Sequence, residues 1–223
     1  YKELLHNITY DPGRNSMETL RRSFFALALL MFILNTGQAQ NNRERLNAFS
    51  DSYTLEAEGD YSGAAEKLRT VYEEGSYELN ARMGWLTYMA GNFTESIAFY
   101  QKAISLKPYA LEPKFGIVLP QSALGNWNAV LRQYEDVLEI DPMNTTAIYK
   151  VGMIYYGRED YEEASKRFEK VVNLYPFDYD SVIMYAWSQF KMGNLREAKV
   201  LFNKALLINP GDESALEGLG LIQ

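Results

Sequence analysis

The segment GNFTESIAFYQKA at residues 91–103 contains the pattern that decides the fold of this chain. A Gly-Asn pair is followed by an aromatic residue, a glutamate, a second aromatic residue and, three positions later, an alanine. The segment DYEEASKRFEKV at 160–171 has a similar order, with Asp160 as the capping residue and Val171 in place of the final alanine. In both segments a capping residue precedes apolar residues spaced to lie on one face, which predicts an amphipathic helix.

The same pattern recurs along most of the chain with a fixed period. Residues of similar type recur every 34 positions in five separate sets, and we call each set a column. All five columns share the same phase, which indicates an internal repeat of one supersecondary unit. These columns are Pro108, Pro142, Pro176 and Pro210; Tyr100, Tyr134, Phe168 and Phe202; Phe93, Trp127, Tyr161 and Leu195; Ala103, Val137, Val171 and Ala205; and Met83, Ile117, Val151 and Tyr185.

Each repeat is expected to form two helices, A and then B. In the 145–178 copy, Ile148, Val151 and Tyr155 lie on one stripe of helix A, and helix B follows from Tyr161. The spaced proline ends each repeat, because proline cannot continue a helix and restricts the residue before it. A capping box is expected at the start of helix B in three copies, formed by Asn92 with Glu95, Asp160 with Glu163, and Asn194 with Glu197.

A 34-residue period with small, aromatic and proline columns resembles the tetratricopeptide repeat, over about residues 45–223. The resemblance implies an all-α, right-handed α-solenoid of helix-turn-helix repeats, in which stacking supplies the core. The first copy diverges, because Gly59 and Gly91 are 32 residues apart and Ser76 stands where the other copies have proline. The expected repeats are about 45–76, 77–110, 111–144, 145–178 and 179–212, with a capping helix at 213–223.

Small residues and one proline stand out within the expected A helices. Gly84, Gly152 and Ala186 are predicted to let helix A approach helix B closely. Pro120 lies inside helix A of the third copy, where it removes a backbone N–H, and we expect a bend for which Gly116 leaves space. That bend has two interpretations: a locally reshaped groove, or a tolerated irregularity.

The N-terminal residues resemble an export signal. Arg21 and Arg22 precede an apolar run at 24–34, and Gly37 and Ala39 end the segment in the small-x-small pattern of a cleavage site. We therefore expect a secretory signal peptide at 17–39, an upstream extension at 1–16, and an exported protein that is periplasmic or secreted, with no stable membrane insertion after cleavage. A retained membrane anchor is the competing interpretation, although the run is shorter than the roughly 20 residues that span a bilayer.

Composition excludes several classes of function. The chain has no cysteine and a single histidine, His6, so catalytic triads, zinc sites and thiol chemistry that need these residues are excluded. The net charge of −7 disfavours nucleic acid as a partner. No phosphate-binding glycine loop is present, and the acidic pairs lie on helix faces expected to be solvated. We predict no catalytic residues, no cofactor and no metal, and hence no enzyme.

The resemblance to tetratricopeptide repeats also implies where a partner binds, because helix A lines the concave face in such arrays. The Lys, Arg and Asn clamp by which chaperone-binding members hold a peptide carboxylate is not reproduced, and aromatic residues take most of the positions. We expect a protein or peptide partner there; the alternatives are a carbohydrate-binding or uptake accessory role for the groove, or packing of the aromatic residues between repeats. The predicted partner-binding residues are Arg82, Trp85, Tyr88, Phe115, Tyr149, Lys150, Tyr156, Trp187, Phe190 and Lys191.

Overall fold

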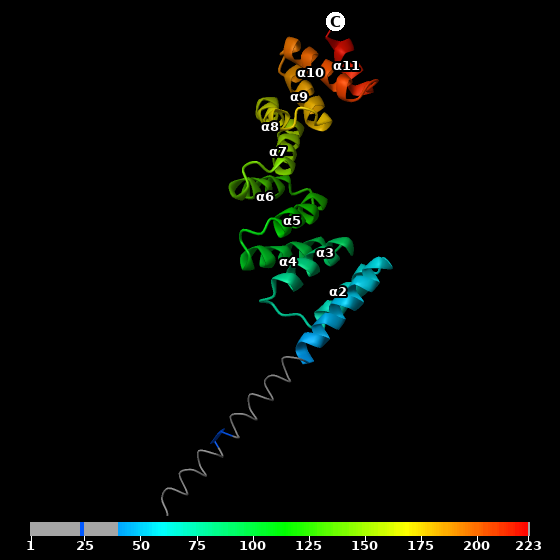
Figure 1. Cartoon of the computed structure of the whole chain (residues 1–223), viewed down its shortest axis with the longest axis vertical. Helices are drawn as coiled ribbons and strands as arrows, with labels where there is room; N and C mark the ends of the chain where they lie inside the picture. Colours follow the sequence, from blue (N-terminus) through cyan, green and yellow to red (C-terminus); the bar gives the residue numbers. More distant parts are fainter. Residues whose placement is uncertain (1–22, 25–39, 223) are drawn as a thin grey trace, which may run out of the picture.

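The computed structural model describes residues 23–24 and 40–222, and every regular element in these ranges is an α-helix. The predicted signal peptide and upstream extension lie outside the described residues, apart from residues 23–24. The helices stack along one long axis (Figure 1). They are a helical segment at 40–57 and α2 (Tyr61–Arg69), α3 (Tyr77–Met89), α4 (Phe93–Leu106), α5 (Glu112–Ala123), α6 (Trp127–Ile140), α7 (Thr145–Gly157), α8 (Tyr161–Leu174), α9 (Tyr179–Lys191), α10 (Leu195–Ile208) and α11 (Glu213–Leu221).

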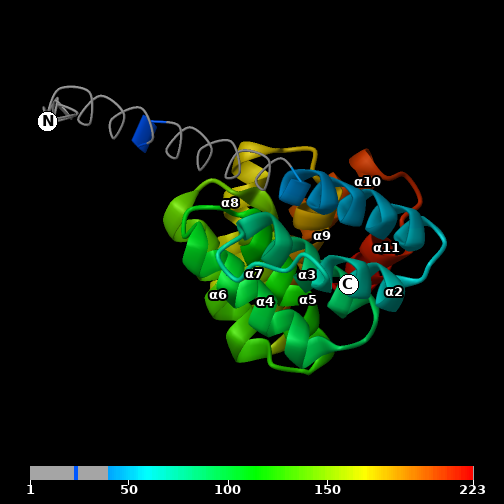
Figure 2. The same ribbon diagram turned by 90° about the horizontal axis from the view of Figure 1, so that it is seen from below.

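Each helix packs on its neighbours in sequence, so the molecule is an α-solenoid, as the period predicted. In the view along the stack (Figure 2) the helix pairs overlap in part, and α8 and α10 appear toward opposite sides of it. Buried side chains form three clusters, one between 40–57, α2 and α3, one across α5–α7, and one from α8 to α11. The core is therefore distributed along the array, as expected when each repeat buries its apolar faces against the next.

The proline column ends helix B in every copy that has it. Helices α4, α6, α8 and α10 stop two residues before Pro108, Pro142, Pro176 and Pro210. The A helices after the last three of these turns are capped by polar side chains, whereas α5, after the first, has Leu111 at its N-cap and no side-chain cap. Asn144, Asp178 and Asp212 each accept the backbone N–H three residues on, at 3.1, 2.9 and 2.8 Å. These caps satisfy N–H groups that have no partner inside the helix.

None of the three predicted capping boxes of helix B forms, and only one of the three capping residues caps its helix with its side chain. Asp160 accepts the N–H of Glu163 at 3.2 Å, whereas Asn92 and Asn194 form no side-chain cap. In a capping box the glutamate side chain accepts the backbone N–H of the capping residue. Here that N–H is already bonded to a backbone carbonyl of the preceding helix A. These bonds run from Asn92, Asp160 and Asn194 to the carbonyls of Thr87, Tyr155 and Gln189, at 2.8, 3.0 and 2.9 Å.

The turn between helices A and B requires a left-handed residue. Gly91, Gly125 and Gly193 occupy this position with φ of 82°, 70° and 80°. In the 145–178 copy the same position is Glu159, with φ of 63°. A residue with a Cβ atom is strained in this region, where glycine is not.

We expect Glu159→Gly to raise the free energy of unfolding by about 1 kcal/mol, because it relieves this backbone strain. Urea denaturation followed by circular dichroism measures the change. The reverse substitution at an equivalent turn, Gly193→Ala, should lower stability by about 1–2 kcal/mol. A destabilised Glu159→Gly variant would contradict the assignment of strain to this residue.

The small residues act as predicted at the contact between helices, with one correction. A Cβ atom on Gly84 would lie 2.8 Å from the Tyr100 ring, and one on Gly152 would lie 2.8 Å from the Phe168 ring. Gly116 does not leave space for a bend at Pro120, because the Tyr100 ring fills that space from the preceding helix B. Helix α5 continues through Pro120, whose side chain is buried.

Candidate binding groove

Three adjoining hollows lie on the face formed by the A helices. The first, of about 640 Å³, is bounded by residues 40–57, α3, α4 and α5, and the second, of about 660 Å³, by α5, α6 and α7. The third, of about 450 Å³, is bounded by α7, α8 and α9. Leu119 lines the first and second hollows, and Tyr149 and Lys150 line the second and third. The hollows therefore follow one another from α3 to α9, each sharing wall residues with the next, and we call this row of hollows the A-helix groove.

Half of the predicted partner-binding residues line these hollows. Arg82, Trp85 and Phe115 line the first hollow, and Tyr149 and Lys150 line the second and third. The remaining five lie on the same set of helices but line none of the three hollows; they are Tyr88, Tyr156, Trp187, Phe190 and Lys191.

The seven aromatic residues of the prediction are half-buried and pack against other rings. The ring centroids of Tyr149 and Phe168 are 5.6 Å apart, and those of Trp187 and Phe202 are 4.9 Å apart. Phe115 lies 6.2 Å from Tyr134 in the same way. These contacts show that the aromatic residues also hold helix A against helix B. Only part of each side chain therefore remains accessible to a partner.

Two tryptophans have their polar group satisfied inside the protein. Trp85 donates its indole N–H to Glu56 at 2.6 Å, and Trp187 donates to Ser214 at 2.8 Å. A buried indole N–H usually requires such a partner. Each bond connects one repeat to its neighbour, so both tryptophans contribute to the stacking of repeats.

Arg82, predicted as a basic groove residue, is neutralised within the fold. Its guanidinium forms an ion pair with Glu56 and lies 4.0 Å from the centroid of the Tyr53 ring. The hydrogen bond from Arg82 is the main cause that lowers the pKa of Glu56 below its ordinary value of 4.5; burial opposes it, and the bond from Trp85 adds to it. Both side chains of the pair are largely buried, with 12% and 22% of their surface exposed.

We expect Glu56→Gln to lower the free energy of unfolding by about 2 kcal/mol at pH 7, because charged hydrogen bonds to Arg82 and Trp85 are lost. Since the folded pKa of Glu56 lies below its unfolded value, this stabilisation is present above pH 4.5 and is lost as the pH falls through the folded pKa. Urea denaturation at pH 7, 5 and 3 measures the free energy of unfolding of the Glu56→Gln variant and of the parent. The two values should converge at the lowest pH. Glu58→Gln, an exposed neighbour, should stay within about 0.5 kcal/mol of the parent. If the parent and Glu56→Gln differed in free energy of unfolding by the same amount from pH 7 to pH 3, the role of the Glu56 charge would be contradicted.

The groove also contains residues that the sequence pattern did not identify as binding residues. Trp127 lines the second hollow with 52% of its surface exposed, although in the sequence its column indicates only the repeat. It is the first residue of helix B, where the ring faces the groove. Leu195, which is 43% exposed in the same column, shows that this column does not require burial. Tyr77 lines the first hollow and donates to Glu112 at 3.2 Å; burial, with the nearby Glu112 charge, raises the pKa of Tyr77 to about 12.

Two family models described as tetratricopeptide repeat match the chain, at residues 53–110 and 155–220. The chain belongs to the tetratricopeptide repeat (TPR) family. Proteins of this family and fold are generally scaffolds that bind proteins or peptides and are not enzymes.

The relatives and solved structures agree with this family. The TPR repeat-containing protein YpiA of Bacillus subtilis is 27% identical over 169 residues, which are 73% of this chain and 39% of YpiA. The TPR repeat-containing protein MJ1428 of Methanocaldococcus jannaschii is 24% identical over 236 residues, 96% of this chain and 39% of that protein. The chain thus spans about two fifths of the length of these relatives.

Two solved structures show the same fold. A TPR protein from Parabacteroides merdae superposes with a TM-score of 0.70 at 21% identity, over 81% of this chain and 72% of that one. YrrB, described as a TPR protein with an unusual peptide-binding site, superposes with a TM-score of 0.65 at 16% identity, over 82% of this chain and 95% of that one.

Proposed function

We propose that this TPR chain is an exported scaffold that binds a protein or peptide partner in the A-helix groove. The observation that carries the proposal is the row of three adjoining hollows, which share Leu119, Tyr149 and Lys150 as wall residues and extend across four repeats. A row of this length suits an extended chain better than a small molecule. The peptide-binding site described for YrrB, a protein of similar fold, supports the same class of partner.

Aromatic residues in the groove favour a protein partner over a sugar. Partly exposed Trp, Tyr and Phe edges are typical of protein interfaces. Sugar binding by stacking needs open ring faces, whereas each of the seven aromatic residues of the prediction is half-buried and lies within 6.2 Å of another ring centroid; Trp127, which was not among them, is the more exposed ring. The predicted carbohydrate role therefore receives no support from this packing.

Export is supported by the sequence at 17–39 alone, which lies outside the described residues except for 23–24. Among the helices of the described ranges, none combines the length and apolar character needed to cross a membrane. Mass spectrometry of the protein isolated from its host tests the proposal directly. An N-terminus at Gln40 in an extracytoplasmic fraction is the expected result, and an intact segment 17–39 would overturn cleavage.

Crosslinking followed by affinity purification from extracytoplasmic fractions tests the groove. Trp187→Ala would remove a contact with the buried Phe202, and Trp187 lines none of the three hollows, so a substitution at an exposed residue that lines them is the cleaner probe. Leu119→Glu changes a residue that is 38% exposed and is shared by two hollows. Leu207→Glu is the matched control, because Leu207 is 79% exposed on α10 and lines none of the three hollows.

A recurrent partner that is lost with Leu119→Glu and kept with Leu207→Glu is the expected result. Circular dichroism must show that both variants fold as the parent does. Loss of the partner with Leu207→Glu alone would place the interface on the other face of the solenoid. Retention with both variants would overturn binding in the A-helix groove.

A further inference from the structure

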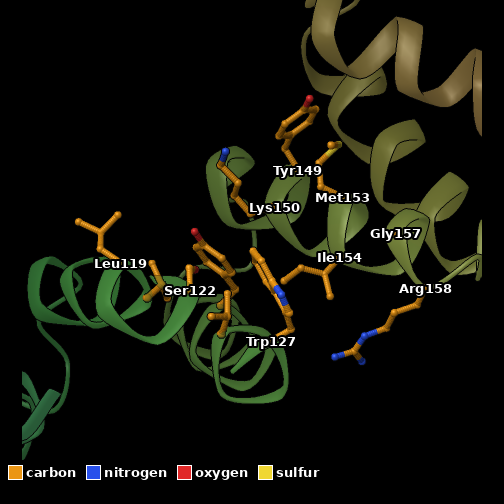
Figure 3. A pocket seen from close by; sticks show the side chains of 12 residues that line it. Leu119, Ser122, Trp127, Tyr149, Lys150, Met153, Ile154, Gly157 and Arg158 are labelled. Atoms are coloured by element: carbon orange, nitrogen blue, oxygen red, sulfur yellow. The ribbon is translucent and has the colours of Figure 1, made fainter. Parts of the chain in front are cut away.

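The second hollow is open because of how the A helices pack around it. Helix α3 packs against α5 and α9 against α11, whereas α5 and α7, like α7 and α9, make little direct contact and are held together mainly through the B helix between them. The gap between α5 and α7 exposes the start of α6, so that Trp127 becomes part of the groove wall (Figure 3).

The wall of this hollow is apolar and accessible. Trp127, Met153 and Leu119 expose 52%, 37% and 38% of their surface, and Val118 and Ile154 are among the other apolar residues of the wall. Its volume of about 660 Å³ is enough for one or two large side chains of a partner. Burial of an aliphatic or aromatic side chain here would remove apolar surface of both molecules from water.

Two cationic side chains lie at the ends of this wall. In Figure 3, Lys150 extends at one end of the wall formed by Trp127 and Ile154, and Arg158 extends at the other. Arg158 donates to the neutral amide oxygen of Asn128 at 2.8 Å. Within residues 40–222, neither cation forms an ion pair with a carboxylate.

The charge of the second hollow differs from that of its neighbours. Glu78 and Glu112 line the first hollow, where Arg82 is already paired, and Asp178 and Asp180 line the third. The residues that line the second hollow include Lys150 and Arg158 and no carboxylate. In a chain of net charge −7, this is a local cationic site around an apolar wall.

We propose that the second hollow binds an acidic peptide segment in which an apolar side chain is flanked by two carboxylates. The apolar side chain packs on Trp127, and the carboxylates pair with Lys150 and Arg158. These two residues are eight positions apart, about 12 Å along the helix axis, which matches three to four residues of extended chain. The inference rests on the proposed function, because it names the chemistry of the segment that the A-helix groove takes.

The experiment is a selection of random twelve-residue peptides displayed on phage against the full chain, followed by fluorescence anisotropy with the best synthetic peptide. We expect the enriched peptides to contain an apolar residue between two acidic residues, each Asp or Glu. The two acidic residues should be three to four positions apart from each other. Lys150→Gln should weaken binding about fivefold, as one exposed charge pair allows, and Trp127→Ala more than tenfold. Replacing the peptide's Asp and Glu by Asn and Gln should weaken binding about as much as the double variant K150Q/R158Q.

Lys191→Gln is the matched control, because Lys191 is also exposed and lines none of the hollows; it should leave the affinity unchanged. Enriched peptides without acidic residues, or equal binding to Lys150→Gln and the parent, would overturn the inference. Displacement of the peptide by laurate, with laurate itself binding through Lys150, would assign the hollow to a fatty acid and would also overturn it.

The same selection separates failure of this inference from failure of the proposed function. Peptides that bind through Leu119 but are insensitive to Lys150 and Trp127 leave the groove function standing and reject the acidic segment. Peptides that are insensitive to Leu119→Glu as well, or no enrichment at all, reject both.

Discussion

Phe168→Ala should lower the free energy of unfolding by about 3–5 kcal/mol, the usual cost of removing a buried phenylalanine. The Phe168 side chain is fully buried and lies in the cluster that connects α8 with α9 and α10. It also packs 5.6 Å from Tyr149 and fills the space beside Gly152. Since a solenoid is stabilised by contacts between neighbouring repeats, a cavity at this position weakens two interfaces together.

Urea denaturation by circular dichroism measures the loss of stability, and hydrogen exchange locates it. We expect faster exchange in α7, α8 and α9 than in α3, because contacts are lost mainly between neighbouring repeats. Phe177→Ala is the matched control: Phe177 is 77% exposed, and the same change in chemistry should cost less than about 0.5 kcal/mol. Equal effects of the two substitutions would contradict the assignment of Phe168 to the core.

The role of Phe168 could be predicted from the sequence because its column repeats. The 34-residue step fixes which aromatic residues lie between repeats, and the prolines fix where helix B ends. Both are consequences of local chemistry that is repeated in each copy. Glu159 illustrates the limit: a strained residue in one copy is visible only when the glycines of the other turns are aligned with it.

The groove was less predictable than the fold. A half-buried aromatic residue on helix A has the same sequence signature whether it contacts a partner or a neighbouring helix, and the structure places Tyr149 and Trp187 against rings of helix B. Arg82 has a partner in a separate repeat, Glu56, which no local pattern identifies. Trp127 lines the groove because α5 and α7 are spread apart, which is a property of the packing.

Gly116→Val is expected to lower the free energy of unfolding by about 3 kcal/mol, at the upper end of the usual cost of overpacking. A Cβ atom at this position would overlap the ring of Tyr100, which is 4% exposed and is enclosed between α3, α4 and α5. The added methyl groups would force α5 away from α4. The effect should be strongest near this seam, in the middle of the array.

A valine at Gly220, in contrast, is not expected to destabilise the protein. No atom lies within 4 Å of a Cβ atom placed there, and the residue is in the exposed part of α11. Since valine favours a helix more than glycine does, Gly220→Val should leave stability unchanged or raise it by about 0.5 kcal/mol. Urea denaturation of both variants therefore separates steric overlap from helix propensity.

A double-mutant cycle with Tyr100→Ala identifies the clashing partner. If the Tyr100 ring is the obstacle, Gly116→Val should cost less than about 1 kcal/mol once the ring is removed, and the coupling between the two sites should be about 2 kcal/mol. Additive effects would place the obstacle elsewhere on α4. Because the Pro120 bend was expected to use the space at Gly116, coupling to Tyr100 would also show that this glycine serves the packing of α4 on α5 and not the proline.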